Sequence, residues 1–156
     1  MNYLGTPLPG VVIVDRKLFR DHRGYFTESY KTSTDNMRGM FRQLNTAQSM
    51  KNVLRGMHRQ DQTKLVMPVY GTIFDVALDP ETGQWFGAEL DNSRAMFIPP
   101  QYAHGYLALS ELSIVQYIVD APYNRDAEET FAWDKYGIEW PITGNPILSD
   151  KDDLHL

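Results

Sequence analysis

Residues 73–83 read Ile-Phe-Asp-Val-Ala-Leu-Asp-Pro-Glu-Thr-Gly, and this stretch decides the class of fold. In its first half Phe74, Val76 and Leu78 alternate with the residues between them, which is the period of two expected of a β-strand. The second half, residues 79–83, is a turn by composition, because Asp, Pro and Gly favour turns. A strand that runs directly into a turn predicts a sheet built from short strands.

Similar strand signals recur along the chain, separated by breaks rich in Gly, Pro or Asp. The expected strands are 11–14, 24–30 (as a strand or an extended arm), 52–58, 64–70, 72–78, 85–90, 95–98, 106–109 and 113–119. One short, weakly amphipathic helix is expected at residues 32–40. Many short strands with almost no helix predict an all-β sandwich or barrel.

Length and composition narrow the classes of protein that remain. The 156 residues are enough for one domain with a core and too few for two ordinary ones. No apolar run is long enough to cross a bilayer, and the N-terminus lacks the features of a signal peptide, so no membrane association is expected. Cysteine is absent, which excludes disulfides and thiolate catalysis and makes the cytoplasm the default compartment.

Charge argues against nucleic acid as a partner but not against an anionic small ligand. The formal net charge is −5, whereas nonspecific nucleic-acid binders normally carry a basic face. Arg55, Arg59 and Lys64 nevertheless lie close together in the sequence, as do Arg20 and Arg23. Such groups predict either a local cationic pocket, as a diphosphate ligand requires, or a solvated basic edge.

Two of the four histidines, His58 and His104, lie in informative surroundings, whereas His22 and His155 are expected at the surface. The spacing around the first two resembles the cupin superfamily. Its first motif has two histidines, a glutamate and a glycine, and its second has a proline before a third histidine. The corresponding positions here hold His58, Gln60, Lys64 and Gly71, then Pro99 and His104. The resemblance implies a double-stranded β-helix, or jelly-roll barrel, with one or two short helices.

The substitutions at the cupin ligand positions argue against a metal. Gln60 is a poor ligand for a transition metal, and Lys64 brings a positive charge to the place where a carboxylate normally offsets the ion. Only two imidazoles of a four-ligand set remain. We therefore expect no metal and no cofactor, and a pocket suited to an oxygen-rich anion and to proton transfer.

Seven stretches, taken together and in order, resemble the dTDP-4-dehydrorhamnose 3,5-epimerase family over nearly the whole chain. They are residues 19–30, 43–45, 52–60, 64–79, 98–110, 137–141 and 148–152. The resemblance implies one domain over residues 1–156. Its N-terminal arm and strands occupy 1–50, its barrel core 51–120, and the C-terminal segment that completes the site 121–156.

The family's chemistry implies roles for four residues. The substrate is a nucleotide-linked 4-keto-6-deoxy sugar, whose ketone makes the hydrogens on C3 and C5 acidic, because removing either gives an enolate. By resemblance, His58 is the base, Asp152 the carboxylate that orients it, Tyr123 the acid on the opposite ring face, and Lys64 the cation near the keto oxygen. Asp150 remains a possible substitute for Asp152.

Further positions match substrate-binding residues of the family. Arg55 and Lys151 match contacts to the diphosphate or the adjoining sugar, Gln43 and Asn45 line the nucleotide and sugar site, and Gln60 and His104 line the pocket. Arg23, Phe26 and Glu28 match an arm that crosses to the other subunit and helps hold the nucleoside. The resemblance therefore implies a homodimer with exchanged N-terminal arms.

Departures from the family pattern leave the substrate and the outcome open. The loop between Gln60 and Lys64 is short, Met67 stands where many members are basic, Ala47 replaces a serine, and Arg59 replaces an apolar residue. The nucleotide could be dTDP, GDP or CDP, and inversion could occur at C3 alone or at C3 and C5. Alternative functions are a sugar-nucleotide 3,4-ketoisomerase, a non-catalytic sugar-nucleotide-binding cupin, and a metal-dependent cupin.

Overall fold

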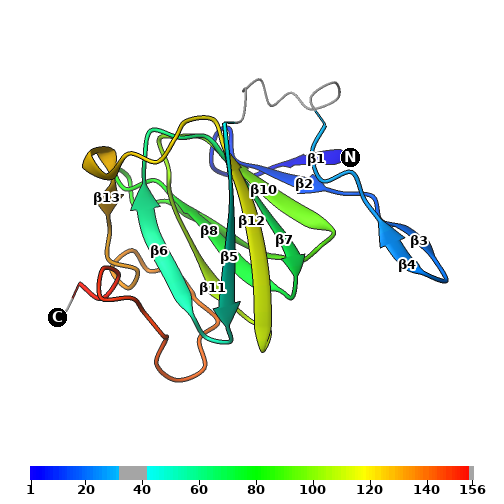
Figure 1. Ribbon diagram of the computed structural model, residues 1–156. Helices are drawn as coiled ribbons and strands as arrows, with labels where there is room; N and C mark the ends of the chain where they lie inside the picture. The colour runs from blue at the N-terminus through cyan, green and yellow to red at the C-terminus, as the bar shows by residue number, and fades with distance from the viewer. Residues whose placement is uncertain (32–41, 155–156) are drawn as a thin grey trace.

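The computed structural model describes residues 1–31 and 42–154, and its regular structure is almost entirely β (Figure 1). The elements are β1 Asn2–Gly5, β2 Val12–Asp15, β3 Phe19–Asp21, β4 Gly24–Phe26, β5 Gln43–Met50, β6 Leu54–Arg59, β7 Lys64–Tyr70, β8 Ile73–Leu78, β9 Trp85–Leu90, β10 Arg94–Ile98, β11 Ala103–Ala108, β12 Leu112–Val119, the 3-10 helix η1 Arg125–Ala127, and β13 Glu129–Thr130. No helix in the described part of the chain is long and apolar enough to span a bilayer.

Two antiparallel sheets make up the body of the molecule. The larger has the order β1-β2-β10-β7-β12-β5, and the smaller has the order β13-β6-β11-β8-β9. From β5 onward the chain passes back and forth between the two sheets, so that strands adjacent in sequence mostly lie in different sheets. This alternation is that of a double-stranded β-helix, and it confirms the predicted all-β jelly roll. The β3–β4 hairpin belongs to neither sheet and projects from the body (Figure 1).

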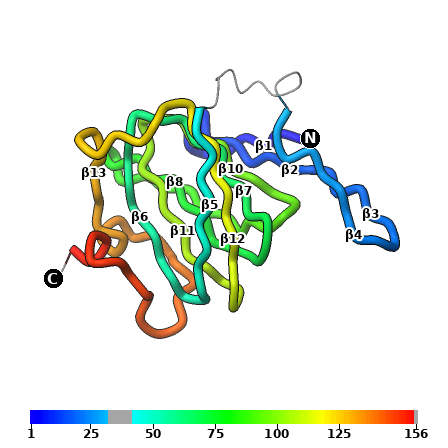
Figure 2. The backbone as a smooth tube through the Cα atoms, viewed as in Figure 1, coloured from blue at the N-terminus to red at the C-terminus, as the bar shows by residue number. Residues whose placement is uncertain are grey.

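Strand β8, which is the first half of residues 73–83, is covered on both faces. Ile73 and Ala77 belong to the apolar core between the sheets. Val76 and Leu78 point the other way, into a second cluster that includes Phe131 and other aromatic side chains of the C-terminal segment. Figure 2 shows this segment running along the β6 side of the smaller sheet. Both faces of β8 are therefore apolar, and the alternating side chains point into two different apolar clusters. Neither face is turned to solvent.

Several predicted strand boundaries are confirmed and several strands were missed. Strands β7 and β9 have the predicted bounds, whereas β11 begins three residues earlier than predicted, at Ala103. Strands β1, β3, β5 and β13 were not predicted as strands. Strand β5 has no apolar strand pattern, because its sequence, Gln-Leu-Asn-Thr-Ala-Gln-Ser-Met, is largely polar. The helix expected at residues 32–40 lies outside the described residues.

Two glycines set the close approach of β6 to β11. A Cβ atom on Gly105 would lie 2.6 Å from the sulfur of Met57 and 2.8 Å from the carbonyl oxygen of Arg55. Gly56, directly across, has φ +117°, a conformation that residues with a side chain rarely adopt. The register beside this contact pairs His58 with His104, so the two histidines predicted for the pocket lie on adjacent strands.

Candidate active site

A cavity of about 770 Å³ lies between the two sheets, and the segments at 121–128 and 147–152 help to enclose it. A volume of this size is typical of small-molecule sites. The lining residues come from five strands and from the loops between and after them: Gln43, Asn45, Ala47, Val53, Leu54, Arg55, His58, Gln60, Gln62, Lys64, His104, Tyr106, Tyr117, Tyr123, Glu128, Ile147, Leu148, Ser149, Lys151 and Asp152.

The polar sequence of β5 follows from its place at the edge of this cavity. Gln43, Asn45 and Ala47 point inward and line it, whereas Leu44 and Met50 on the opposite face are exposed. The Gln43 amide donates to the Asn45 side-chain oxygen over 2.7 Å. The inward face of β5 is therefore a set of hydrogen-bonding groups facing a polar cavity and not a hydrophobic core face.

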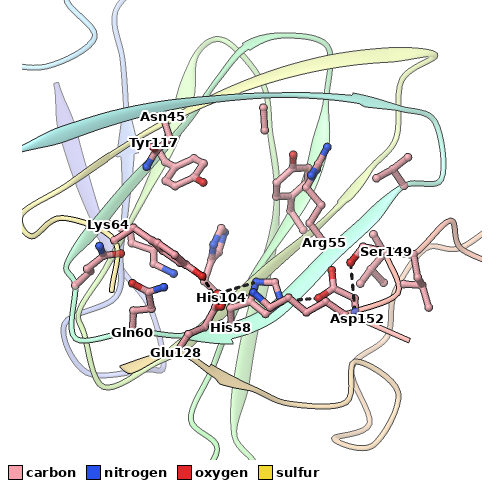
Figure 3. Close-up of a pocket in the computed structure, with 18 of the residues that line it drawn as sticks. Asn45, Arg55, His58, Gln60, Lys64, His104, Tyr117, Glu128, Ser149 and Asp152 are labelled. Atoms are coloured by element: carbon pink, nitrogen blue, oxygen red, sulfur yellow. Dashed lines mark hydrogen bonds and ion pairs between the residues drawn. The ribbon is translucent and has the colours of Figure 1, made fainter. Parts of the chain in front are cut away.

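His58 forms a pair with Asp152 in the cavity wall (Figure 3). The two residues lie 94 positions apart, and Nε2 of His58 is 2.5 Å from Oδ1 of Asp152. The Gly56 amide donates to the other carboxylate oxygen over 3.2 Å. Burial acts to raise the pKa of Asp152, but the hydrogen bond and charge of His58 and the Gly56 amide outweigh it, so the pKa lies below its ordinary value. An ionised Asp152 accepts from Nε2–H, which leaves Nδ1 of His58 as the basic nitrogen.

The Glu128 carboxylate interacts with three of the predicted site residues, Tyr123, Lys151 and His58. One of its carboxylate oxygens, Oε2, accepts hydrogen bonds from the Tyr123 hydroxyl, over 3.0 Å, and from Nζ of Lys151. The other, Oε1, lies 3.9 Å from Nδ1 of His58. Burial acts to raise the pKa of Glu128, but the hydrogen bonds from Lys151 and Tyr123 and the charge of His58 outweigh it. The pKa therefore lies below its ordinary value, and the group is a carboxylate at neutral pH.

Lys64 extends into the cavity from β7 and is only 8% exposed. Burial lowers its pKa to about 8, although the charges of Asp75 and Glu128 oppose the shift. On β11, in the smaller sheet, Nε2 of His104 lies 2.7 Å from Oδ1 of the fully buried Asp75. The two sheets therefore contribute to the cavity a cation that is easily deprotonated and a second histidine–carboxylate pair.

Arg55 is an exposed residue of the cavity lining and is held by its neighbours. Its Nε donates to the Ser49 hydroxyl over 3.0 Å, and its guanidinium also donates to the carbonyl of Gln48 over 3.0 Å. The Ser49 hydroxyl in turn lies 3.0 Å from the Tyr106 hydroxyl. Burial raises the pKa of Tyr106, which keeps that phenol neutral. A fixed guanidinium at the cavity edge is suited to an anionic oxygen group.

Ten of the thirteen sequence-predicted site residues line this one cavity. They are His58, Tyr123, Asp152, Lys64, Gln43, Asn45, Arg55, Gln60, His104 and Lys151. The choice between the two aspartates is also resolved in geometric terms, because Asp152 contacts His58 while Asp150 is exposed.

Arg23, Phe26 and Glu28 do not line the cavity of their own chain. Arg23 and Phe26 lie on the projecting hairpin, where Arg23 pairs with Asp21 over 2.6 Å and the Phe26 side chain is 66% exposed. Glu28 follows the hairpin and pairs with Lys31 over 3.3 Å. Within one chain, the predicted nucleoside-holding arm and the cavity are therefore separate.

Two residues that lie near the site in sequence are not part of the cavity. Arg59 does not add to a cationic pocket: it points to the outer side of β6, where it pairs with Glu129 over 2.7 Å and Glu81 over 3.3 Å. Met67 does not lie beside the cavity either. It faces outward from β7 into an apolar cluster with Val14 and other residues. Because side chains alternate along a strand, Lys64 and Met67 project to opposite faces of β7.

Sequence reasoning missed Glu128, Tyr106 and Tyr117 among the lining residues. Glu128 lies in the run Asp-Ala-Glu-Glu, whose composition is that of an exposed loop. Tyr106 and Tyr117 lie in apolar strands, where a tyrosine is expected to be a core residue. The period of two would have placed Tyr106 on the face of His104, a signal that was available.

The residues of this site do not fit a metal centre. His58 and His104 are each paired with a carboxylate, and the remaining cupin ligand positions hold Gln60 and Lys64. Within residues 1–31 and 42–154, no group of three or more histidine, aspartate or glutamate side chains is placed to hold a metal ion.

Comparison with known proteins connects the site to one family. The family model for dTDP-4-dehydrorhamnose 3,5-epimerase matches residues 5–156. A curated dTDP-4-dehydrorhamnose 3,5-epimerase of Salmonella typhimurium is 40% identical, with 97% of this chain and 92% of the Salmonella chain covered. The Escherichia coli enzyme of the same name is 38% identical, with 98% and 92% covered.

Solved structures agree with the sequence comparison. A Legionella pneumophila dTDP-6-deoxy-D-glucose-3,5-epimerase in complex with dTDP-4-keto-L-rhamnose superposes with a TM-score of 0.92 at 33% identity, covering 97% of this chain and 89% of the other. A Bacillus anthracis dTDP-4-dehydrorhamnose 3,5-epimerase with TDP and pyrophosphate bound gives 0.90 at 35% identity, covering 98% and 97%. With a full-length family match, two-fifths identity to a curated enzyme and a shared fold, this chain belongs to the dTDP-4-dehydrorhamnose 3,5-epimerase family of isomerases.

Proposed function

We propose that this protein is a cytoplasmic epimerase that inverts C3 and C5 of a dTDP-linked 4-keto-6-deoxy sugar by removing and returning protons through an enolate. The observation that carries the proposal is the His58–Asp152 pair, whose free imidazole nitrogen faces a cavity of the size of a small-molecule site. The names of the Salmonella and Legionella relatives support the choice of dTDP as the nucleotide.

His58 serves as the base in this proposal. Its Nδ1 takes the proton from the carbon next to the ketone, while Asp152 holds the ring through Nε2–H and stabilises the imidazolium that forms. An imidazole suits this role because its ordinary pKa of about 6.5 lies near neutral pH.

Tyr123 and Lys64 complete the chemistry. Tyr123 approaches the cavity from the loop side and delivers its phenolic proton to the face of the sugar opposite His58. Lys64 is buried in the wall, where its ammonium group stabilises the negative charge that develops on the keto oxygen. A proton removed from one face and returned on the other inverts the carbon.

The rest of the lining residues hold the substrate. Arg55 and Lys151 provide positive charge for the diphosphate, and Gln43 and Asn45 offer amide groups to the nucleotide and sugar. Gln60 and His104 supply further hydrogen-bonding groups beside the sugar.

The projecting hairpin suggests how a second subunit takes part. We propose a homodimer in which the arm bearing Arg23, Phe26 and Glu28 reaches across to the cavity of the partner and helps to hold the nucleoside. Support comes from the exposed Phe26 and from the separation of this arm from the cavity of its own chain. A large apolar side chain on an otherwise unpacked hairpin gains free energy when a partner covers it.

The test is a panel of 4-keto-6-deoxy sugars linked to dTDP, GDP or CDP, incubated with the protein in heavy water and followed by NMR. We expect deuterium at C3 and at C5 of the dTDP sugar, a ketone that stays at C4, and no exchange with His58→Asn. The control variant Glu111→Gln, altered at a carboxylate that is 92% exposed and does not line the cavity, should keep its exchange activity.

Other outcomes identify the other functions. A ketone that moves to C3 indicates a 3,4-ketoisomerase. Deuterium at C3 alone indicates a monoepimerase, and binding without any exchange indicates a sugar-nucleotide-binding protein. Absence of exchange at C3 and C5 for every sugar in the panel would falsify the proposed function.

A further inference from the structure

Glu128 contacts both the proposed base and the proposed acid. Its Oε1 lies 3.9 Å from Nδ1 of His58 (Figure 3). Its Oε2 accepts a hydrogen bond of 3.0 Å from the Tyr123 hydroxyl. Its side chain is only 11% exposed. We propose that Glu128 is a proton relay that returns the proton from His58 to Tyr123 after each inversion. This inference rests on the roles proposed above for those two residues.

The need for such a relay follows from the stoichiometry of inversion. One inversion moves a proton from carbon to Nδ1 of His58 and another from the Tyr123 hydroxyl to the same carbon. The enzyme is left with an imidazolium and a phenolate, and neither can repeat its step. His58 must lose a proton and Tyr123 must gain one before the next inversion, so an enzyme that inverts two carbons requires this reset twice for each substrate.

The path through Glu128 balances in protons and electrons. The Nδ1–H bond of His58 breaks as an O–H bond forms on Oε1 of Glu128. Rotation of the carboxylic acid group then presents this proton to the Tyr123 phenolate, where the O–H bond is restored. The separation of 3.9 Å is about 1 Å longer than a hydrogen bond, so the first transfer needs a small side-chain movement or one bridging water.

Lys151 keeps the relay group in the form that can accept a proton. Its ammonium group donates to Oε2, and together with Tyr123 it lowers the pKa of Glu128. A carboxylate with a low pKa holds a proton only briefly, whereas a phenolate is by far the stronger base, with an ordinary pKa of about 10 against about 4.3 for a glutamate. The proton therefore does not remain on Glu128 but passes on to Tyr123.

The decisive experiment separates the first proton transfer from continuous turnover in Glu128→Gln. Glutamine keeps the size and an acceptor for the Tyr123 hydroxyl but cannot carry a proton. With enzyme in excess, we expect the rate of the first C–H exchange to stay within about threefold of the unsubstituted protein, while kcat falls by about tenfold or more. Added formate or imidazole buffer should then raise kcat, because a small acid or base replaces the relay.

Glu129→Gln is the matched control. It makes the same substitution at the next residue, whose carboxylate faces outward to Arg59, and we expect kcat and the first-exchange rate to be unchanged and insensitive to buffer. Equal losses of kcat and first-exchange rate in Glu128→Gln, without buffer rescue, would show that Glu128 only positions Tyr123. No loss of either would show that solvent resets the site, and both results overturn the relay.

Two further measurements keep the inference separate from folding defects and from the proposed function. If Glu128→Gln does not fold, Glu128→Asp provides the test, because its carboxylate can carry a proton but is too short to reach both partners. Its kcat should fall more than its first-exchange rate and recover with buffer, and equal losses without recovery overturn the relay. Exchange by the unsubstituted protein tests the epimerase function itself, so a failure of that function is recognised before any variant is compared.

Discussion

Asp152 shows at the scale of a residue how a position that looks exposed in sequence can be buried in the fold. It lies in the run Asp-Lys-Asp-Asp, whose composition is that of a solvated tail, yet it is only 4% exposed and contacts His58 and Gly56. Asp150, two residues away, is exposed. The two carboxylates therefore differ in their contacts and not in their chemical type.

We predict that Asp152→Asn lowers kcat by about 10²- to 10⁴-fold, because an amide does not stabilise the imidazolium of His58 as a carboxylate does. Substrate affinity should change much less. Asp150→Asn is the control, since it removes the same charge without touching His58, and its kcat should match that of the unsubstituted protein. Steady-state kinetics on both variants measure the difference. A similar loss in the two variants would contradict the pairing.

The lowered pKa of Lys64 predicts that activity declines at alkaline pH. Its pKa is lowered to about 8, so the ammonium group is present below that pH and is lost as the pH rises through it. If this cation stabilises the enolate, kcat/KM should fall above about pH 8. The profile of kcat/KM against pH from about 6 to 10 measures this, since it reports the groups of the free enzyme.

Lys64→Arg separates this effect from other alkaline groups. A guanidinium stays charged over the whole range, so the variant should have lower activity but no decline near pH 8. An unchanged decline in Lys64→Arg would assign the limit to a different group and contradict the role of Lys64.

At the scale of an element, the contact between β6 and β11 fixes the relative positions of the two pocket histidines. Gly56 and Gly105 let the strands approach, and the register places His58 opposite His104. A methyl group on Gly105 would meet the Met57 sulfur and the Arg55 carbonyl, and the carbonyl belongs to the backbone and cannot easily move aside.

We predict that Gly105→Ala lowers the free energy of unfolding by about 1–3 kcal/mol, the usual cost of inserting an atom into a packed site. Activity should fall as well, because β6 carries His58. Gly5→Ala is the control, since a methyl group there meets nothing within 4 Å. Denaturant unfolding and C–H exchange measure the two effects. If the two variants have the same free energy of unfolding, then β6 and β11 can move apart to fit the methyl group without loss of stability, and the prediction is wrong.

At the scale of the whole molecule, the arm and the cavity must come from different chains if the proposed dimer is correct. We predict that two inactive proteins restore activity when mixed: His58→Asn, and a double variant with Arg23→Ala and Phe26→Ala. In a mixed dimer, one site has an intact base and receives an intact arm. Subunit exchange at equal amounts should recover about a quarter of full activity, as half of the dimers are mixed and half of their sites are complete.

An arm that acts within its own chain gives a different result. Every site in the mixed dimer then lacks either the base or the arm, and the mixture stays inactive. Sedimentation of each variant serves as the control that both remain dimers, because loss of the dimer would prevent exchange for a separate reason.

The sequence by itself determined the architecture and most of the site. Alternation in residues 73–78 and regular turns predict an all-β sandwich or barrel, because side-chain direction along a strand depends on the local backbone. The spacing around His58 and His104 implies a jelly roll through its resemblance to the cupins. The same local patterns, matched in order along the chain, indicated the family. They also allowed ten of the thirteen predicted site residues to be found before any contact was known.

Only the tertiary structure decided which residues meet. Asp152 and His58 are 94 positions apart, and Glu128 reaches Tyr123, Lys151 and His58 through the path of two loops. Such contacts depend on sheet register and loop course, which no local pattern records. Arg59 differs in part: the period of two already places it on the face of β6 opposite its neighbour His58, and only its pairing with Glu129 depends on the tertiary structure.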